Sequence, residues 1–523
     1  MLKIHSLPEA SPKSDLYNIT INGNPVVAEF ARVSAMPFNT PWPGHQRDKS
    51  QTEESPFISF EADENVEICV TSKEKINKVF VRPLSKEINY DIVSDNTVKF
   101  ELSAVGSYVL EINGLHNPLN IFFNPVRDFV AETKAKEEQG RKVYYFAPGV
   151  HNVGEMEIES HSTVTVDAGA IVYGNISTFN AEDVEINGYG VIDGSCEIRH
   201  NDEYRRLLIP VFASSPYWKS MEYDPENPFF VNDKEKFDKF MEDTKCLKGI
   251  LRFYFSKNIK CEGVILRDAS TFCVVPAACD NAVFDNIKII GSWRYNSDGI
   301  DLFNSINVEI KNCFIRNFDD SIVIKGILGW DFQNNENIIV DNCVVWCDWG
   351  AALEIGAETN APEYKNITFK NCYLLYDAAG SMMRIHHHNR AKISNIKYEN
   401  IHVEFHIDHM NTMIQQSDDH VYEYVEGKEQ PALLTLTIPP EVLYGPDGTK
   451  STIRDVVFKN IYMHIEEGIA KNPDLHFRGY NADCTVDGVK LINFYKNGKL
   501  VEDIKELSII KNDFAHNIEY IKE

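Results

Sequence analysis

The segments Asn307-Val-Glu-Ile-Lys-Asn312 and Asn337-Ile-Ile-Val-Asp-Asn342 share one pattern, in which two asparagines enclose a short β-prone run. The pattern recurs, and the residue that closes it is Gly263, Asn286, Asn312, Asn342, Asn371 and Asn400 in successive copies. These closing residues are 23 to 30 residues apart, a period typical of a solenoid whose coils bury their apolar sides against one another. We therefore predict an all-β fold, a parallel β-helix.

Two positions of the repeat indicate how the coils stack. Asparagine at the corner of a coil tolerates a left-handed turn and can form a hydrogen-bonded ladder. The residue after the closing corner predicts an inward-facing stack of Val264, Ile287, Cys313, Cys343, Cys372, Ile401 and Ile461. Because the cysteines number eleven and several occupy this position, we expect buried thiols and not a disulfide framework.

The N-terminal part of the chain has a different sequence pattern. Short runs that alternate apolar and polar residues are separated by polar breaks, which is the spacing of a β-sandwich. We expect residues 1–125 to form an accessory β-sandwich that packs on the β-helix or caps it, with independent carbohydrate binding as the alternative. Residues 126–142 then form a charged connector, 143–505 the β-helix, and 506–523 a C-terminal tail.

Two long stretches, 199–247 and 406–452, interrupt the repeat. The first contains four prolines, and the second mixes histidines and acids with a Pro-Gly turn. Insertions on a solenoid usually form loops beside the binding groove. We therefore expect both stretches to border the functional site.

The charge balance limits the classes of partner. The chain of 523 residues has a formal net charge of −26, which argues against nucleic acid and anionic membranes. It has no apolar run of 18 residues, and the first residues given, from Met1 to Glu9, contain no apolar segment of the kind found in signal peptides. We expect a cytoplasmic protein from the chain as given, or a secreted or periplasmic one if a signal was removed.

Three aspartates stand out in the repeat. Asp298 lies in Tyr295-Asn-Ser-Asp-Gly-Ile-Asp-Leu302, and Asp319 and Asp320 follow it by 21 and 22 residues in Asn317-Phe-Asp-Asp-Ser-Ile-Val-Ile324. That spacing is about one coil, and strands of adjacent coils lie ~4.8 Å apart, so the three acids are expected to crowd one site. Two consecutive acids inside an apolar strand suggest a bulge or a side chain that points against the pattern.

Crowded carboxylates point to acid–base chemistry. Like charges at one site are costly unless the pKa values of the groups diverge, so that one acid holds a proton while another is ionised. A glycosidase needs such a pair of groups, namely an acid that protonates the leaving oxygen and a base that activates water. The bland alternative is that these are solvated loop charges of an acidic protein.

The acid motifs resemble those of the polygalacturonase family of glycoside hydrolases, family 28, and of its relatives, the dextranase and isopullulanase family 49. The family's Asn-Thr-Asp motif falls on Asn296-Ser297-Asp298, and its Asp-Asp motif on Asp319-Asp320. The resemblance covers roughly residues 140–500, and an N-terminal β-sandwich is closer to the dextranase group. It implies a right-handed parallel β-helix and inverting hydrolysis without a cofactor, with Asp319 as the general acid while Asp298 and Asp320 orient and deprotonate water.

Two departures from the family concern substrate charge. Ala351 stands where polygalacturonases have the histidine of Gly-His-Gly, and Arg384-Ile385-His386 replaces their Arg-Ile-Lys. In the family, the lysine and arginine grip the carboxylate of the substrate. We therefore predict that neutral glycosides are hydrolysed at least as well as galacturonides, with uronate cleavage favoured at low pH by a charged His386.

Several other residues are candidates for substrate binding. Arg384, His386 and His388 alternate onto one face of a strand; they bind sugar, form a solvated polar face, or hold a metal, although two histidines are too few for a closed zinc site and we predict no metal. Glu354 is either a sugar-binding acid or a surface acid. The remaining candidates are aromatic platforms and neighbours of the acids, namely Trp330, Trp349, Asn296 and Lys325. Asp301 and Lys325 flank the acids and are expected to support them.

The sequence thus predicts an inverting hydrolase of an oligo- or polysaccharide. One alternative is a polysaccharide lyase, which is often β-helical as well but needs Ca²⁺ and a strong base and makes an unsaturated, UV-absorbing product. A second alternative is a non-catalytic carbohydrate-binding β-helix, which leaves the buried acid pair unexplained.

Overall fold

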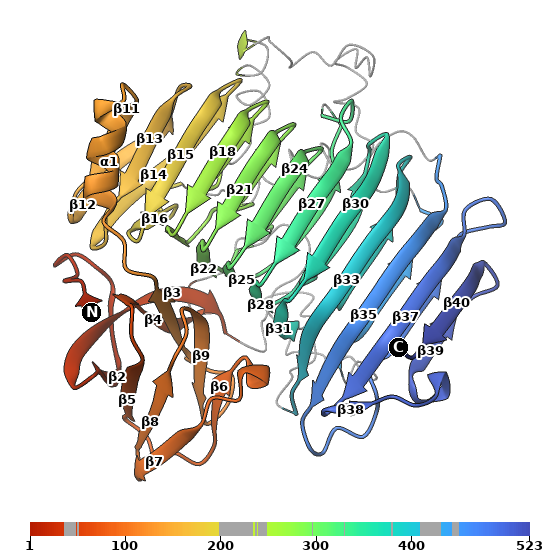
Figure 1. The fold of residues 1–523 in the computed structure, drawn as a ribbon, viewed down its shortest axis with the longest axis horizontal. Helices are drawn as coiled ribbons and strands as arrows, with labels where there is room; N and C mark the ends of the chain where they lie inside the picture. The colour runs from red at the N-terminus through yellow and green to blue at the C-terminus, as the bar shows by residue number, and fades with distance from the viewer. Residues whose placement is uncertain are drawn as a thin grey trace.

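A computed structural model describes residues 1–35, 49, 52–197, 234–235, 238, 248–294, 296–328, 330–377, 380–407, 430–441 and 449–523. The strands form a ten-stranded N-terminal sheet and a 30-stranded parallel β-helix (Figure 1). The predicted fold class is confirmed. Most of the two predicted insertions, 199–247 and 406–452, lies outside the described residues. No helix among the described residues is long and apolar enough to span a membrane.

The N-terminal domain encloses its own apolar core. Ile21, Ile68, Val98, Leu110 and Ile121, each fully buried, lie in that core on five different strands. The strands are β1 (Leu2–Ile4), β2 (Lys13–Ile21), β3 (Asn24–Ser34), β4 (Thr52–Ala62), β5 (Val66–Ser72), β6 (Val79–Arg82), β7 (Tyr90–Ser94), β8 (Thr97–Leu102), β9 (Gly106–Ile112) and β10 (Leu119–Asn124). A 3₁₀ turn, η2 (Leu84–Lys86), follows β6.

The predicted connector contains one helix, α1 (Phe129–Glu138). Asp128 caps it, because its side chain accepts a hydrogen bond of 3.0 Å from the backbone N–H of Ala131. The sequence shows no apolar stripe here, and only Phe129 and Thr133 are buried. This missing periodicity is the reason that the helix was not expected from the sequence.

The coils of the β-helix contribute strands to three parallel sheets. The first sheet contains β11 (Lys142–Phe146), β13 (Ser162–Val166), β15 (Glu182–Gly188), β18 (Lys257–Glu262), β21 (Asp280–Asp285), β24 (Ile306–Lys311), β27 (Asn335–Asp341), β30 (Glu363–Lys370), β33 (Lys392–Phe405), β35 (Ile453–Ile465), β37 (Val486–Lys496) and β40 (Ala515–Ile521). The second contains β12 (Gly149–Glu157), β14 (Ala170–Phe179), β16 (Val191–Asp193), β19 (Ile265–Arg267), β22 (Lys288–Ser292), β25 (Phe314–Asn317), β28 (Val344–Cys347) and β31 (Tyr373–Asp377). The third continues from β14 through β17 (Leu251–Tyr254), β20 (Val274–Ala277), β23 (Ile300–Phe303), β26 (Ile322–Gly326), β29 (Leu353–Thr359), β32 (Ser381–His387), β34 (Ala432–Thr437), β36 (Asp474–Arg478) and β39 (Ser508–Lys511).

The corner asparagines form the ladder that the repeat predicts. Asn312 and Asn342 have φ angles of 56° and 52°, in the left-handed region. The side-chain amide of Asn342 donates to Oδ1 of Asn312 at 2.8 Å, and that of Asn400 donates to Asn371 at 3.1 Å. Cysteines in the described part of the chain are free, and most are buried in the coil interior, as expected from their position in the repeat.

The end of the chain differs from the predicted tail, 506–523. After a short antiparallel strand, β38 (Lys499–Leu500), and a 3₁₀ turn, η3 (Ile504–Glu506), strands β39 and β40 add to the third and first sheets. The solenoid therefore continues to Ile521. The strand signal is weak here because the last coil has no further coil to bury its outer side, so polar residues are tolerated in its strands.

The N-terminal domain packs on the second sheet of the β-helix. Phe57 and Phe122 of the N-terminal domain lie in one buried apolar cluster with Phe314 of β25 and Trp346 of β28, and the rings of Phe122 and Phe314 are 5.2 Å apart. Figure 1 shows the N-terminal strands beside β22, β25 and β28. This packing places the N-terminal domain next to the turns that follow the second sheet.

Candidate active site

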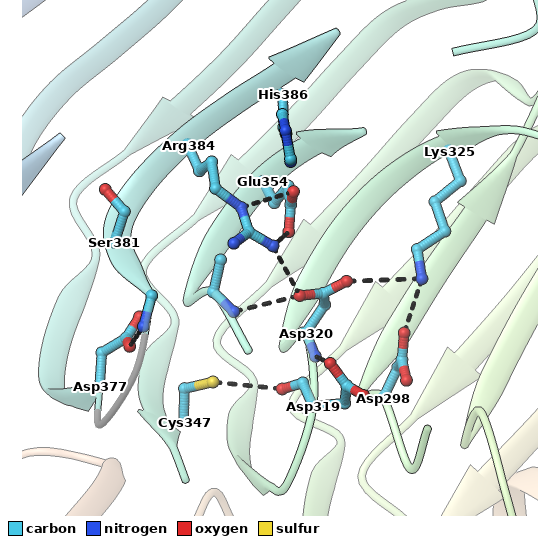
Figure 2. A network of polar contacts seen from close by, with 12 residues as sticks. Asp298, Asp319, Asp320, Lys325, Cys347, Glu354, Asp377, Ser381, Arg384 and His386 are labelled. Carbon is cyan, nitrogen blue, oxygen red and sulfur yellow. Dashed lines mark hydrogen bonds and ion pairs between the residues drawn. The ribbon is translucent and has the colours of Figure 1, made fainter. Parts of the chain in front are cut away.

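The three predicted catalytic acids lie in the bends between the second and third sheets. Asp298 lies between β22 and β23, and Asp319 and Asp320 lie one coil further, between β25 and β26. Ile300 pairs with Ile322, so Asp298 and Asp320, each two residues earlier, occupy equivalent positions in adjacent coils (Figure 2). The expectation of two acids within a strand is wrong: the pair lies in a bend, where neither side chain has to break an apolar alternation.

Asn317 fastens the two bends together. Its buried side-chain amide donates to the carbonyls of Ser297 at 3.2 Å, Asp319 at 2.8 Å and Asp320 at 2.9 Å. Its Oδ1 accepts a hydrogen bond of 2.6 Å from the hydroxyl of Ser321. Asn317 cannot be recognised from the sequence, because an asparagine that ends a strand cannot be distinguished from a corner asparagine by pattern alone.

Lys325 lies beneath the acids as their shared counter-ion. Its Nζ is 2.7 Å from Asp298, 3.1 Å from Asp301 and 3.5 Å from Asp320, and its side chain is only 4% exposed. Lys325 was proposed to bind substrate, but a buried ammonium held by three carboxylates positions those acids instead. The pairing also explains why a lysine is tolerated at this buried position, since a buried charge requires close partners.

Asp320 is the most strongly anchored of the acids. Its Oδ1 accepts hydrogen bonds from the backbone N–H of Ala351 at 3.1 Å and from Arg384 at 3.2 Å, and its Oδ2 faces Lys325. A side chain at Gly350 would place its Cβ 2.3 Å from the backbone nitrogen of Asp320, so glycine is required at this close approach. Burial alone would raise the pKa of Asp320, but Lys325 and Arg384 outweigh it and hold this pKa below its ordinary value.

Asp319 has the opposite electrostatic environment. Its Oδ1 accepts the backbone N–H of Asp320 at 3.2 Å, and among the described residues no lysine, arginine or histidine forms an ion pair with it. Burial, reinforced by the neighbouring charge of Asp320, raises the pKa of Asp319 to about 7. Two adjacent carboxyl groups thus differ in protonation near neutral pH, because the cations on one side of the bend serve Asp320.

Asp298 and Asp301 form a second acidic pair around Lys325. Burial raises the pKa of Asp298 well above its ordinary value, with Asp301 contributing, and burial raises the pKa of Asp301 to about 6. Oδ1 of Asp298 accepts no hydrogen bond from the described residues. The pair therefore holds a proton more readily than isolated aspartates, which suits Asp298 to orienting a water molecule.

Arg384 and Glu354 form a two-pronged ion pair across adjacent coils. Glu354 of β29 pairs in register with Arg384 of β32, and Nε and Nη2 of Arg384 each donate to a separate oxygen of Glu354 at 2.6 Å. Glu354 is fully buried, so neither of its predicted roles, surface acid or sugar-binding acid, fits its surroundings. Burial opposes the charge of Arg384, but Glu354 and Asp320 outweigh it and raise the pKa of the guanidinium.

His386, in β32, contacts His388, which follows the end of this strand. Nε2 of His388 is 2.9 Å from Nε2 of His386, and Nδ1 of His388 lies 3.2 Å from the carbonyl of Glu441. His388 is buried, whereas His386 is half-buried, so only His386 keeps the predicted access to a ligand. Burial, with Arg384 second, lowers the pKa of His386 well below its ordinary value, which disfavours the predicted charging of His386 in the histidine range.

The aromatic candidates separate into one buried and one half-buried residue. Trp330 is 6% exposed and packs between Phe255 and Phe303, so its ring is part of the core and not a sugar platform. Trp349 is half-buried beside the acid bend and stacks on Phe318 at 6.0 Å with an interplanar angle of 3°. Asn296 is half-buried at the start of the Asp298 bend, while Tyr295 lies outside the described residues.

Comparison with known proteins confirms the resemblance drawn from the acid motifs. Residues 233–431, which include all three candidate acids, match the model of Glycosyl hydrolases family 28. Over 109 residues the chain is 28% identical to Probable endopolygalacturonase D of Neosartorya fischeri, covering 20% of this chain and 21% of that relative. Over 164 residues it is 26% identical to Exopolygalacturonase of Cochliobolus carbonum, covering 29% and 35%. The matches thus span about a fifth to a third of the length of these curated relatives.

A solved structure extends the similarity of fold to the whole chain. Dex49A from Penicillium minioluteum superimposes with a TM-score of 0.55 over 99% of this chain and 96% of that chain, at 10% sequence identity. At this identity the similarity concerns the fold alone, and it includes both the N-terminal domain and the β-helix.

Proposed function

We propose that this protein is a glycoside hydrolase that cleaves an oligo- or polysaccharide with inversion at the anomeric carbon. The family match over the acid-bearing coils supports the hydrolase class. The finer assignment, an inverting mechanism that uses Asp298, Asp319 and Asp320, rests on the electrostatics of the bends.

The observation that carries the proposal is the contrast between two adjacent carboxyl groups. Asp320 is held by Lys325, Arg384 and a backbone N–H, which favour its ionised form. Asp319 has no such cation among the described residues, and burial raises its pKa to about 7. A glycosidase requires one carboxylic acid and one carboxylate across the scissile bond, and this contrast supports that assignment.

In the proposed mechanism Asp319 donates its proton to the glycosidic oxygen as the bond from that oxygen to the anomeric carbon breaks. Asp320 removes a proton from a water molecule whose oxygen attacks the anomeric carbon from the opposite face. Asp298 orients this water. The cycle closes when Asp320 loses its new proton and Asp319 regains one from solvent, so no cofactor or oxidant is consumed.

The test is a screen of the purified protein against polysaccharides and aryl glycosides, with detection of reducing ends and of ultraviolet absorbance. Release of reducing ends without an unsaturated product is expected. An unsaturated, absorbing product would indicate a lyase. Saccharide binding without turnover by any member of the panel would indicate a carbohydrate-binding protein and would contradict the proposed hydrolysis.

A further inference from the structure

The cation that faces the acid bend is already engaged by the protein. Nε and Nη2 of Arg384 point at the two oxygens of Glu354, and Nη2 also contacts Asp320 (Figure 2). Parallel N–H bonds from one guanidinium to one carboxylate are the geometry by which arginine would otherwise bind the carboxylate of a ligand. Glu354 therefore occupies the Nε–Nη2 edge of the guanidinium, where two parallel N–H bonds could otherwise bind a uronate.

Other cations of the site are engaged as well. Lys325 is buried among Asp298, Asp301 and Asp320. Nζ of Lys450, which lies toward the histidines, donates to the carbonyl of Glu441 at 2.7 Å and to that of Pro439. His386 is paired with His388, and two neutral imidazoles offer no charge to a carboxylate.

The buried acids near the bend outnumber these cations. Glu358 is a further acid of the same strand as Glu354 and is 8% exposed. A carboxylate brought into this region meets like charge, which is costly where water is excluded. To bind the Nε–Nη2 edge of Arg384, it would also have to displace Glu354, leaving that fully buried carboxylate without its partner.

We propose that Glu354 determines the charge preference of this site by withholding the Nε–Nη2 edge of Arg384 from the ligand. The site then takes a glycoside whose sugar ring beside Arg384 carries no carboxylate. This inference rests on the proposed glycosidase function, and it adds a specificity-determining residue to it. Glu354 acts through Arg384 and does not itself touch the reacting atoms.

The test uses substrate pairs that differ only in charge at C6. Oligogalacturonides are compared with their methyl esters, and 4-nitrophenyl galacturonide and glucuronide with the corresponding galactoside and glucoside, in both anomers. The wild type is expected to cleave the neutral member of a pair with at least a tenfold higher kcat/KM. Glu354→Gln, which keeps the size of the side chain, is expected to shift this ratio toward the uronate by at least tenfold, and Glu354→Ser provides a second variant.

The ratio within a pair removes any general loss of rate caused by a displaced Asp320. Glu358→Gln is the matched control, because it removes a carboxyl group from the same strand without releasing a contact of Arg384, and its ratio should stay within threefold of the wild type. Two results would overturn the assignment of Glu354. One is a wild type that cleaves the uronate faster than the neutral member of a pair, and the other is a neutral-to-uronate ratio of kcat/KM that is the same in Glu354→Gln as in Glu358→Gln.

A binding measurement separates this inference from the proposed function. Calorimetric titration of Asp319→Asn and of Asp319→Asn/Glu354→Gln with oligogalacturonide and its methyl ester needs no turnover. The second variant is expected to bind the uronate at least tenfold more tightly than the first. Equal affinities would overturn the role of Glu354, whereas a wild type that cleaves no member of any pair, with the affinity difference present, would contradict hydrolysis alone.

Discussion

Two buried networks in this protein each contain more carboxylates than cations, yet they have different roles. At the contact between the domains, Arg82 of β6 bonds to both oxygens of Glu111 at 2.7 and 2.9 Å and to Glu404 of β33. The second oxygen of Glu404 accepts the backbone N–H of Leu84 at 2.6 Å. In the acid bends, Lys325 serves Asp298, Asp301 and Asp320.

The difference lies in which oxygens are left to titrate or to meet a ligand. Every carboxylate oxygen around Arg82 has a donor, and Arg82, Glu111 and Glu404 are 1–2% exposed, so that network closes a domain contact. Around Lys325, one oxygen of Asp298 has no donor among the described residues, and Asp319 and Asp320 are 9% and 8% exposed. A buried acid cluster whose oxygens are incompletely satisfied is an arrangement that favours chemistry over stability.

The largest expected effect is on catalysis by Asp319→Asn. Removal of a general acid typically costs ~10²–10⁴-fold in rate, and the isosteric amide leaves the backbone bonds of the bend in place. Initial rates on the substrate found by screening measure the loss, and a thermal melt serves as the control for folding. Retention of more than a tenth of the wild-type kcat would remove Asp319 from the acid role.

The next effect is on stability and comes from the domain contact. Arg82→Met leaves Glu111 and Glu404 buried without their cation, which is expected to lower the free energy of unfolding by about 3–5 kcal/mol. Denaturant unfolding measures this change. The exposed pair of Lys73 and Asp15 offers the control, since Lys73→Met should cause no measurable change. An equally small effect of Arg82→Met would show that the network is not needed for docking.

The pH dependence of kcat/KM gives a smaller effect that separates the two networks. Asp319 acts when protonated and its pKa is about 7, so activity is present below this value and declines tenfold per pH unit above it. Asp320 acts when ionised and its pKa is lowered, so activity should persist down to its ordinary value of 3.8. The folded fraction of Arg82→Met should show the wild-type profile. Activity that rises between pH 7 and 9 would contradict the acid assignment.

The smallest effect is expected for His386→Ala. Because burial lowers the pKa of His386 well below 6.5, this side chain stays neutral across the histidine range and cannot pair with a uronate there. The ratio of kcat/KM for a galacturonide and its methyl ester is expected to change less than threefold between pH 5 and 7, in the wild type and in the variant alike. A rise in KM confined to the uronate would restore His386 as a carboxylate ligand.

The sequence predicts the parts of this molecule that are set by local periodicity. The corner asparagines and the cysteine stack follow from a repeat that is visible in the amino-acid sequence. The spacing of one coil likewise places Asp298 next to Asp320. The last coil and α1 were missed because neither has an apolar pattern of its own. Contacts that repeat from coil to coil can therefore be predicted from the sequence. Elements that form only because they pack on a neighbouring surface cannot.

The partners of the charged side chains could not be predicted in the same way. Glu354, Arg384 and Lys325 were expected to meet a ligand, but they meet one another and the aspartates across neighbouring coils. The register of β29 against β32 decides this pairing, and a register is fixed by loop lengths and bulges that a single sequence does not reveal. The same limit applies to Trp330, whose burial depends on Phe255 and Phe303 in other coils.

The anomeric configuration of the first product tests the central claim, the separate acid and base roles of Asp319 and Asp320, most directly. It depends on which step each carboxyl group performs. Proton NMR during the first minutes of hydrolysis distinguishes the two anomers before they equilibrate in water. If Asp319 protonates the leaving oxygen while Asp320 activates water on the opposite face, the first sugar released has the inverted anomeric configuration. A first product that retains the configuration of the substrate would contradict the account, since it requires a covalent intermediate and a nucleophilic carboxylate.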